Sequence, residues 1–184
     1  SAEAKDLDDA VSISKHEDHY ILGVHIADVS YYVKGNSALD KEALNRGTSI
    51  YYANKVVPML PKELSNGICS LNPNEDRLTF SVFLKVDFEG NLKNYTFKKT
   101  VINSKIKGIY SEINTILSGE TTPEILEKYA HVMDSIILMN ELADLLIACK
   151  KRRGAPQIET VESKLIIDEN DVCIGVTPRV RGKS

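Results

Sequence analysis

Three carboxylates lie within four residues near the start of the chain, at Asp6, Asp8 and Asp9. Neighbouring carboxylates repel one another, which raises their pKa values unless a cation neutralises them. Carboxylate oxygens are hard ligands of the kind that Mg²⁺ and Mn²⁺ prefer. Two such ions, held about 3.5–4 Å apart, can activate a water molecule and stabilise the leaving oxygen when a phosphodiester is hydrolysed. The cluster is therefore a candidate site for metal-dependent hydrolysis.

Spacing alone leaves other interpretations of this acidic cluster open. Short acidic runs are common on protein surfaces, so a solvated turn is the more frequent occurrence. In an extended chain Asp6 and Asp8 share one face and Asp9 points away, so a turn is needed to bring the three together. A phosphatase of the haloacid dehalogenase type has a strongly apolar strand before its aspartates, and residues 1–5 are not apolar. No nucleotide-binding pattern supports a glycosyltransferase, and a calcium EF-hand needs a longer loop.

The composition of the chain sets limits on its class. Its 184 residues favour one domain that is large enough to bury a core. No signal peptide or long apolar run is present, so we expect a cytoplasmic protein without a membrane partner. The net charge of −3 argues against nucleic-acid binding through bulk positive charge, although carboxylates that hold cations can still act on RNA. Cys69, Cys149 and Cys173 fit no metal-ligand spacing and are expected to be reduced and mostly buried.

The elements that position the cluster follow from hydrophobic periodicity and turn residues. Alternating patterns predict hairpins, the clearest of which turns at Gly90, where glycine permits a positive φ. Helical periodicity is strongest over residues 123–153, and an unbroken helix of that length would span roughly 45 Å. Strands are predicted at residues 10–14, 19–26, 48–52, 77–87, 92–102, 158–167 and 172–176, and helices at residues 37–45, 110–117 and 123–153. The fold class is α+β, with a mixed or antiparallel sheet and one long helix packed against it.

The segment from residue 55 to residue 73 has a different composition. It holds Pro58, Pro61, Gly67 and Pro73, with serine and asparagine between them. Such a composition predicts a long irregular segment with little regular structure of its own. Long ordered loops inside compact domains are often functional.

An ordered series of motifs resembles the catalytic (RNB) domain of the ribonuclease II and ribonuclease R family, and is closer to ribonuclease R. Each motif alone is only moderately specific, but because all of them occur in the family's order, the probability of a chance match is very small. The segments that carry the resemblance are residues 4–11 (AKDLDDAV), 23–33 (GVHIADVSYYV), 46–51 (RGTSIY), 57–61 (VPMLP), 64–73 (LSNGICSLNP) and 76–78 (DRL), with weaker matches at residues 152–155 (RRGA) and 165–170 (LIIDEN).

The resemblance implies a processive exoribonuclease that hydrolyses single-stranded RNA from its 3′ end and releases nucleoside 5′-monophosphates. Asp6, Asp8 and Asp9 fall on three of the family's four catalytic aspartates, which implies that they hold Mg²⁺, or Mn²⁺ in its place. Tyr51 falls on the aromatic residue that stacks against the 3′-terminal base, although its type and spacing alone favour a half-buried strand aromatic. Tyr110 lies where the family often has an aromatic near the RNA path, but residues 105–109 depart from the usual pattern.

Two other features have structural explanations. His25 lies inside a predicted strand, where a hydrogen-bonding role is favoured over catalysis. The basic run from Lys150 to Arg153 lies at the end of the predicted long helix, so stabilisation of the helix C-terminus explains it at least as well as contact with RNA phosphates.

The resemblance also implies that residues 1–184 are the N-terminal portion of a catalytic domain excised from a longer enzyme. The family's first catalytic aspartate would precede Ser1, its arginine-rich motif would follow the chain, and flanking cold-shock and S1-type domains would supply a basic RNA channel. We therefore expect the fragment alone to be inactive and to expose apolar surface. A non-catalytic RNA-binding relative with the same fold is the main alternative, and a phosphatase-like metal-binding module is a third hypothesis.

Overall fold

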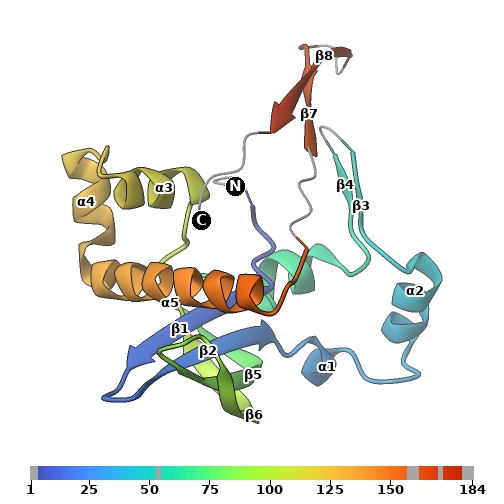
Figure 1. The fold of residues 1–184 in the computed structure, drawn as a ribbon. Coiled ribbons are helices and arrows are strands. Elements are labelled where there is room, and N and C mark those ends of the chain that lie inside the picture. The colour runs from blue at the N-terminus through green and yellow to red at the C-terminus, as the bar shows by residue number, and fades with distance from the viewer. Residues whose placement is uncertain (1–3, 53–54, 157–161, 170–171, 180–184) are drawn as a thin grey trace.

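The largest sheet has four antiparallel strands in the order β1-β2-β5-β6 (Figure 1). The computed structural model describes residues 4–52, 55–156, 162–169 and 172–179. The two predicted hairpins of this sheet and the α+β class are confirmed, and Gly90 has the expected positive φ of 81°. The strands are β1 (Asp9–Lys15), β2 (His19–Ala27), β5 (Asp76–Asp87) and β6 (Leu92–Asn103).

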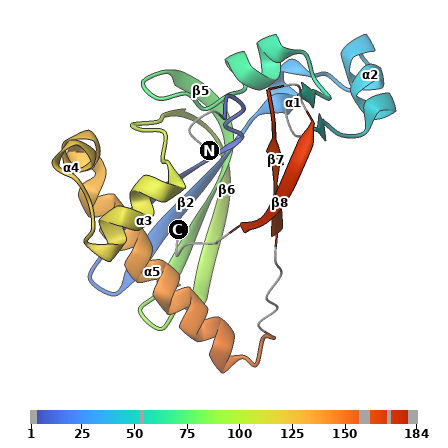
Figure 2. The same cartoon turned by 90° about the horizontal axis from the view of Figure 1, so that it is seen from above.

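Helix α5 (Met133–Arg152) crosses one face of this sheet, as Figures 1 and 2 show. Leu142 of the helix is buried against Tyr20 and Val86, which are directly opposite each other on β2 and β5. An ion pair of 2.7 Å between Lys15 Nζ and Glu141 Oε1 lies beside this contact. The helix therefore covers the end of the sheet where the two hairpins turn.

The predicted unbroken helix over residues 123–153 is wrong in one respect. The structure divides it into α4 (Pro123–Tyr129), a 3₁₀ turn (Ala130–Val132) and α5, and α4 runs in a different direction from α5 (Figure 1). The physical reason is Tyr129, which is fully buried and bonds to α3 (Tyr110–Ser118). Its hydroxyl donates to Glu112 Oε2 at 2.7 Å and accepts from the Ile109 N–H at 3.0 Å. Packing against α3 thus overrides a continuous helical pattern.

The shorter elements lie in the part of the sequence that connects β2 to β5. Helix α2 forms as predicted: Ser37 caps it by accepting from the Asp40 N–H at 3.1 Å, and Gly47 ends it with a φ of 71°. The predicted strand at residues 48–52 is present only as a two-residue strand. The prediction of little regular structure over residues 55–73 is wrong, because the segment contains a strand and a helical turn. These elements are α1 (Val29–Tyr32), α2 (Ala38–Arg46), β3 (Ile50–Tyr51), β4 (Val56–Val57) and the turn η1 (Glu63–Ile68).

Part of the sheet face that carries Tyr20 and Val86 stays open to solvent beyond α5. The Phe80 and Phe97 rings stack there with centroids 5.7 Å apart, and each side chain is about half exposed. The expectation of exposed apolar surface is thus confirmed among the residues that the structure describes. Other apolar side chains exposed on this face are Val11, Ile26, Tyr95 and Val101.

The last hairpin and the cysteines complete the fold. Strands β7 (Glu162–Ile167) and β8 (Cys173–Arg179) pair as predicted, and Figure 1 shows them projecting away from the main sheet. Residues 158–161 of the predicted strand lie outside the described residues. All three cysteines are free thiols, as expected, but Cys173 is exposed while Cys69 and Cys149 are buried.

Candidate active site

The acidic cluster lies where the chain enters the sheet. Asp6 and Asp8 are in the irregular stretch before β1, and Asp9 is the first residue of that strand. The Ala27 N–H, at the end of β2, donates to the Asp8 carbonyl at 3.0 Å, and the Leu71 N–H donates to the Leu7 carbonyl at 2.8 Å. Bonds from two separate parts of the fold therefore fix the backbone between the aspartates.

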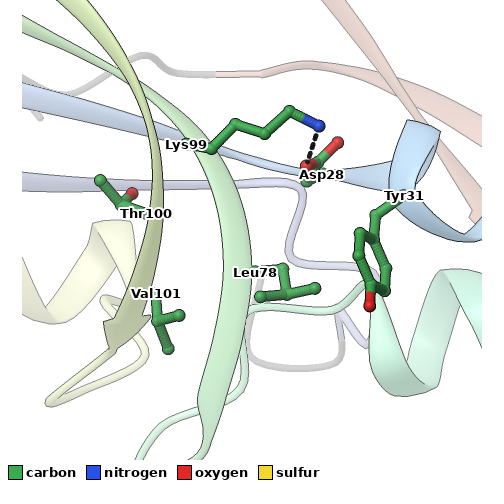
Figure 3. A pocket seen from close by; sticks show the side chains of 6 residues that line it. All are labelled: Asp28, Tyr31, Leu78, Lys99, Thr100 and Val101. Carbon is green, nitrogen blue, oxygen red and sulfur yellow. Dashed lines mark ion pairs between the residues drawn. The ribbon is translucent and has the colours of Figure 1, made fainter.

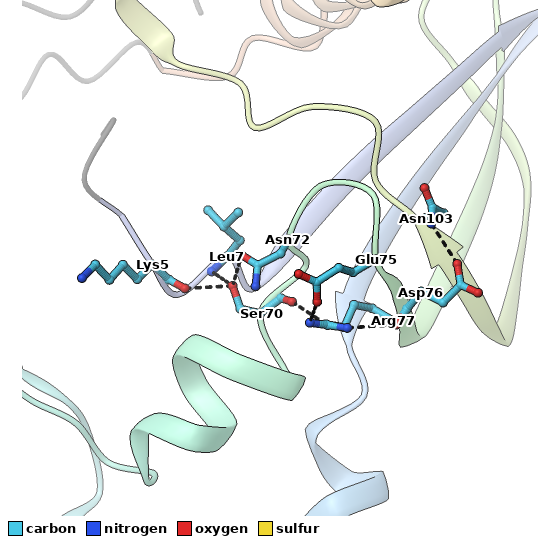
Figure 4. A network of polar contacts seen from close by, with 8 residues as sticks. All are labelled: Lys5, Leu7, Ser70, Asn72, Glu75, Asp76, Arg77 and Asn103. Carbon is cyan, nitrogen blue, oxygen red and sulfur yellow. Dashed lines mark hydrogen bonds and ion pairs between the residues drawn. The ribbon is translucent and has the colours of Figure 1, made fainter.

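A polar network around Ser70 holds the same stretch (Figure 4). The Ser70 hydroxyl donates to the Lys5 carbonyl at 2.8 Å and accepts from the Leu7 N–H at 3.1 Å. Arg77 Nε donates to the Ser70 carbonyl at 2.9 Å, and its guanidinium also pairs with Glu75. The segment over residues 55–73, which motif composition marked as functional, thus contributes the support of the acidic cluster.

Electrostatics couple the three aspartates. The Asp8 side chain is exposed, but nearby protein atoms remove part of its water, and this desolvation is the largest cause of its raised pKa. The charges of Asp6 and Asp9 raise the pKa of Asp8 further. A divalent cation would relieve this repulsion, so the donor set has the chemistry that Mg²⁺ needs.

The geometry of the described residues supplies only part of a metal site. Among residues 4–52, 55–156, 162–169 and 172–179, no three His, Cys, Asp or Glu side chains converge in a way that could hold a metal ion. Asp6, Asp8 and Asp9 are therefore neighbours that repel one another without forming a closed set of ligands. The predicted role of these aspartates as metal ligands stays a prediction.

Tyr51 lies directly beside the acidic cluster. Its hydroxyl donates to Asp6 Oδ2 at 3.1 Å, although 45 residues separate the two in the sequence. This bond is the main reason that the pKa of Tyr51 is raised, because the bond favours the protonated phenol. The side chain is 66% exposed, so its ring is available for stacking. The strand pattern alone favoured a half-buried aromatic, and the structure shows an exposed one.

Tyr110 begins α3 and is also exposed, at 62%. Lys107, three residues earlier, reaches the acidic stretch by donating from Nζ to the Ala4 carbonyl. This contact brings the start of α3 toward the segment that carries the aspartates. The expected contact of Tyr110 with RNA stays a prediction.

His25 has the structural role that the sequence favoured. Its ring is buried and contacts the Ser12 hydroxyl at 2.9 Å and the Ser81 hydroxyl at 2.8 Å. Thr100 extends the chain of polar contacts, with its hydroxyl 2.6 Å from that of Ser81 and 2.7 Å from that of Thr79. Burial lowers the pKa of His25, which favours the neutral ring.

A buried acidic side chain that the sequence analysis did not single out lies next to the candidate active site. Asp28 follows β2 and is paired with Lys99 at 3.0 Å, beside a shallow hollow of about 250 Å³ (Figure 3). A hydrogen bond from Ser30 is the largest cause of its lowered pKa, followed by Lys99. The only sequence signal was its position inside the motif of residues 23–33. The ion pair with Lys99 and the hydrogen bond from Ser30 therefore account for the burial of this carboxylate.

Two further expectations concern surface features. Lys150, Lys151 and Arg152 lie in the last turn of α5, and Arg152 donates to the Glu89 carbonyl in the β5–β6 turn. These contacts are those of a helix end that packs on the hairpin. No helix within the described ranges is long and apolar enough to cross a membrane.

Comparison with known proteins agrees with the order of motifs. A family model for the RNB domain matches residues 1–184. Ribonuclease R 1 of Lactococcus lactis is 48% identical over 182 residues, which cover 98% of this chain and 22% of that protein. Ribonuclease R of Thermotoga maritima is 47% identical over 182 residues, with 98% and 25% covered.

A solved structure shares both the fold and the sequence pattern. Mycoplasma genitalium RNase R, in complex with ribose-methylated single-stranded RNA, superposes with a TM-score of 0.91 at 33% identity, covering 98% of this chain and 28% of that one. The chain thus spans about a quarter of the relatives that it matches. The match over its full length, together with the motifs that surround the acidic cluster, shows that the chain belongs to the RNB domain family.

Proposed function

We propose that this chain is the part of a ribonuclease R-type 3′→5′ exoribonuclease that carries carboxylates of its hydrolytic site. The observation that carries the proposal is the bond of 3.1 Å between the Tyr51 hydroxyl and Asp6. It places an exposed aromatic ring, suited to stacking on a base of any sequence, beside a cluster of carboxylates. A nuclease that trims RNA without sequence preference needs these two functions side by side.

Each residue would have a distinct role. Asp6, Asp8 and Asp9 would hold Mg²⁺, or Mn²⁺, together with carboxylates from outside the described residues. The bound ions would supply Lewis-acid chemistry at the scissile phosphodiester. Tyr51 would stack on the 3′-terminal base, and Tyr110 would contact the RNA further along. The products would be nucleoside 5′-monophosphates.

The surroundings of the site would come from the longer enzyme. The chain is acidic overall, with a net charge of −3, so a basic RNA channel would have to be supplied by other domains, of the cold-shock and S1 types. Two related structures are of an RNase R bound to single-stranded and to double-stranded RNA, which supports RNA as the substrate. The enzyme would act in the cytoplasm. The described residues by themselves would be inactive, because they lack a closed set of metal ligands.

The test is degradation of a 5′-labelled single-stranded RNA by the full-length enzyme, with Mg²⁺ and with a chelator. The wild type should shorten the RNA to a small end product only when the metal is present. Asp9→Asn should abolish degradation and leave RNA binding largely intact, because the change removes a charge and keeps the shape of the side chain. Undiminished degradation by Asp9→Asn would contradict the proposed mechanism.

A non-catalytic RNA-binding protein is the second candidate. The observation in its favour is that the described residues do not form a complete metal site. It predicts that the well-folded full-length wild type binds the same RNA but leaves it intact with Mg²⁺. Release of phosphate from small phosphomonoesters would instead support a phosphatase-like module.

A further inference from the structure

One buried hydroxyl holds both peptide groups that flank Asp6. Ser70 is fully buried, and its Oγ donates to the Lys5 carbonyl at 2.8 Å and accepts from the Leu7 N–H at 3.1 Å (Figure 4). A serine hydroxyl has one hydrogen to donate. The Asn72 side-chain oxygen, at the longer distance of 3.3 Å, is therefore the weaker acceptor.

These two bonds fix the direction of the Asp6 side chain. The Lys5 carbonyl belongs to the peptide group before the Asp6 Cα atom, and the Leu7 N–H belongs to the peptide group after it. When both peptide planes are held, φ and ψ of Asp6 are set, and with them the direction of its Cα–Cβ bond. The Asp6 carboxylate accepts a hydrogen bond from the Tyr51 hydroxyl, so the position of the Tyr51 ring depends on the same support.

Ser70 is itself held from two sides. Its N–H donates to the Gly67 carbonyl at 3.0 Å, and its carbonyl accepts from Arg77 Nε at 2.9 Å. The Arg77 side chain is only 15% exposed and is paired with Glu75. Because the Ser70 backbone is held in place, its hydroxyl can restrain the acidic segment and does not simply move with it.

Burial shows that the hydroxyl is there for its bonds. Ser70 lies between Cys69 and Leu71, which are both buried in an apolar cluster with Ala27. A polar group in such surroundings destabilises the fold unless it is hydrogen bonded. An alanine would fill nearly the same volume at this position without that requirement.

We propose that Ser70 is a positioning residue of the hydrolytic site, which orients Asp6 for metal binding and Tyr51 for the terminal base. This inference rests on the proposed function, because the metal and the base are those of the exoribonuclease. It assigns a role to a residue that touches neither of them.

The test compares Ser70→Ala with a matched control, Ser81→Ala. Ser81 is also a fully buried hydroxyl, but it bonds to His25 and Thr100 within the sheet. In the full-length enzyme, the Mg²⁺ concentration for half-maximal RNA degradation should rise by roughly tenfold or more in Ser70→Ala, as is usual when support of a metal ligand is removed. In Ser81→Ala it should stay close to the wild-type value, because Ser81 bonds within the sheet and does not hold the peptide groups beside Asp6.

A second readout is independent of metal and of activity. In the 184-residue chain, hydrogen exchange of the Leu7 amide should accelerate in Ser70→Ala by more than the change in global stability explains. Ser81→Ala should change Leu7 exchange only as far as it changes global stability. This comparison separates local release of the acidic segment from general loosening of the fold.

The outcomes separate the two proposals. A well-folded wild-type enzyme that leaves the RNA intact with Mg²⁺ would overturn the proposed function, and one that degrades it equally well with chelator would overturn the metal mechanism; either result would overturn the role of Ser70 as well. A metal-dependent wild type whose Mg²⁺ requirement is the same in Ser70→Ala would overturn the role of Ser70 alone. Equal shifts in Ser70→Ala and Ser81→Ala would also overturn it, because they would show that any lost buried hydroxyl has the same effect.

Discussion

Gly90 is the point where the β5–β6 turn meets the backbone of α5. Its φ is 81°, and a Cβ atom placed on it would lie 2.5 Å from the Leu145 carbonyl oxygen and 3.0 Å from the Cys149 Cβ. Real Cβ atoms do not approach a backbone oxygen so closely, so Gly90→Ala has to push the hairpin away from the helix. The effect should be a loss of stability from two separable causes.

The magnitude of each cause can be estimated. An alanine in the left-handed region costs about 1–2 kcal/mol relative to ordinary backbone. Forcing an extra carbon into a packed contact adds about 1–3 kcal/mol. Gly119 provides the control, since its φ is 77° and nothing lies within 4 Å of its Cβ position. Gly119→Ala should therefore show only the backbone cost, and Gly90→Ala the sum.

The assay is urea unfolding of the two variants and the wild type, followed by circular dichroism. Gly90→Ala should lower the free energy of unfolding by about 1–3 kcal/mol more than Gly119→Ala does. For a chain of this size, each kcal/mol corresponds to a fall in Tm of roughly 2–4 °C. Equal losses in the two variants would refute the steric argument and would mean that the turn does not press on α5.

Two further predictions concern buried polar groups. Tyr129→Phe removes the acceptor of the Ile109 N–H and the donor to Glu112, so it should lower stability by about 1–3 kcal/mol and accelerate hydrogen exchange at the Ile109 amide; unchanged exchange would contradict the bond. His25 has a folded pKa below its unfolded value of about 6.5, because burial disfavours its charged form. Its neutral form therefore favours folding above that pH, and stability should fall as the pH drops from 7 toward 5. This fall should be smaller in His25→Asn, and an equal fall in both proteins would show that His25 is not the titrating group.

The elements that depend on local signals could be predicted from the sequence. Alternation of apolar residues defined β1, β2, β5 and β6, and Gly90 marked the turn between the last two. The helix predicted at residues 37–45 has Ser37 and Gly47 at its two ends, where capping and left-handed backbone are properties of single residues. The type and place of these elements therefore followed from short stretches of chain.

Contacts between distant parts of the chain decided the rest. The break in the helix at Tyr129 depends on Glu112 and Ile109, which a helical pattern within residues 123–153 does not contain. The aspartates and Tyr51 were identified by motif, but their hydrogen bond joins two segments 45 residues apart. Ser70 was missed as a support for the acidic stretch because its partners lie 63 and 65 residues away.

The side-chain contacts that join His25 to neighbouring hydroxyl groups affect how the strands of the sheet pair. Their members come from all four strands, with Ser12 on β1, His25 on β2, Ser81 on β5 and Thr100 on β6. A slip of any strand by one residue would turn its polar member toward the opposite, apolar face. The partner of that member on the adjacent strand would stay buried without its hydrogen bond, so mispaired sheets would be less stable than the native pairing. The side-chain contacts around His25 therefore favour the native strand register, in which Asp9 at the start of β1 lies opposite Ile26 near the end of β2.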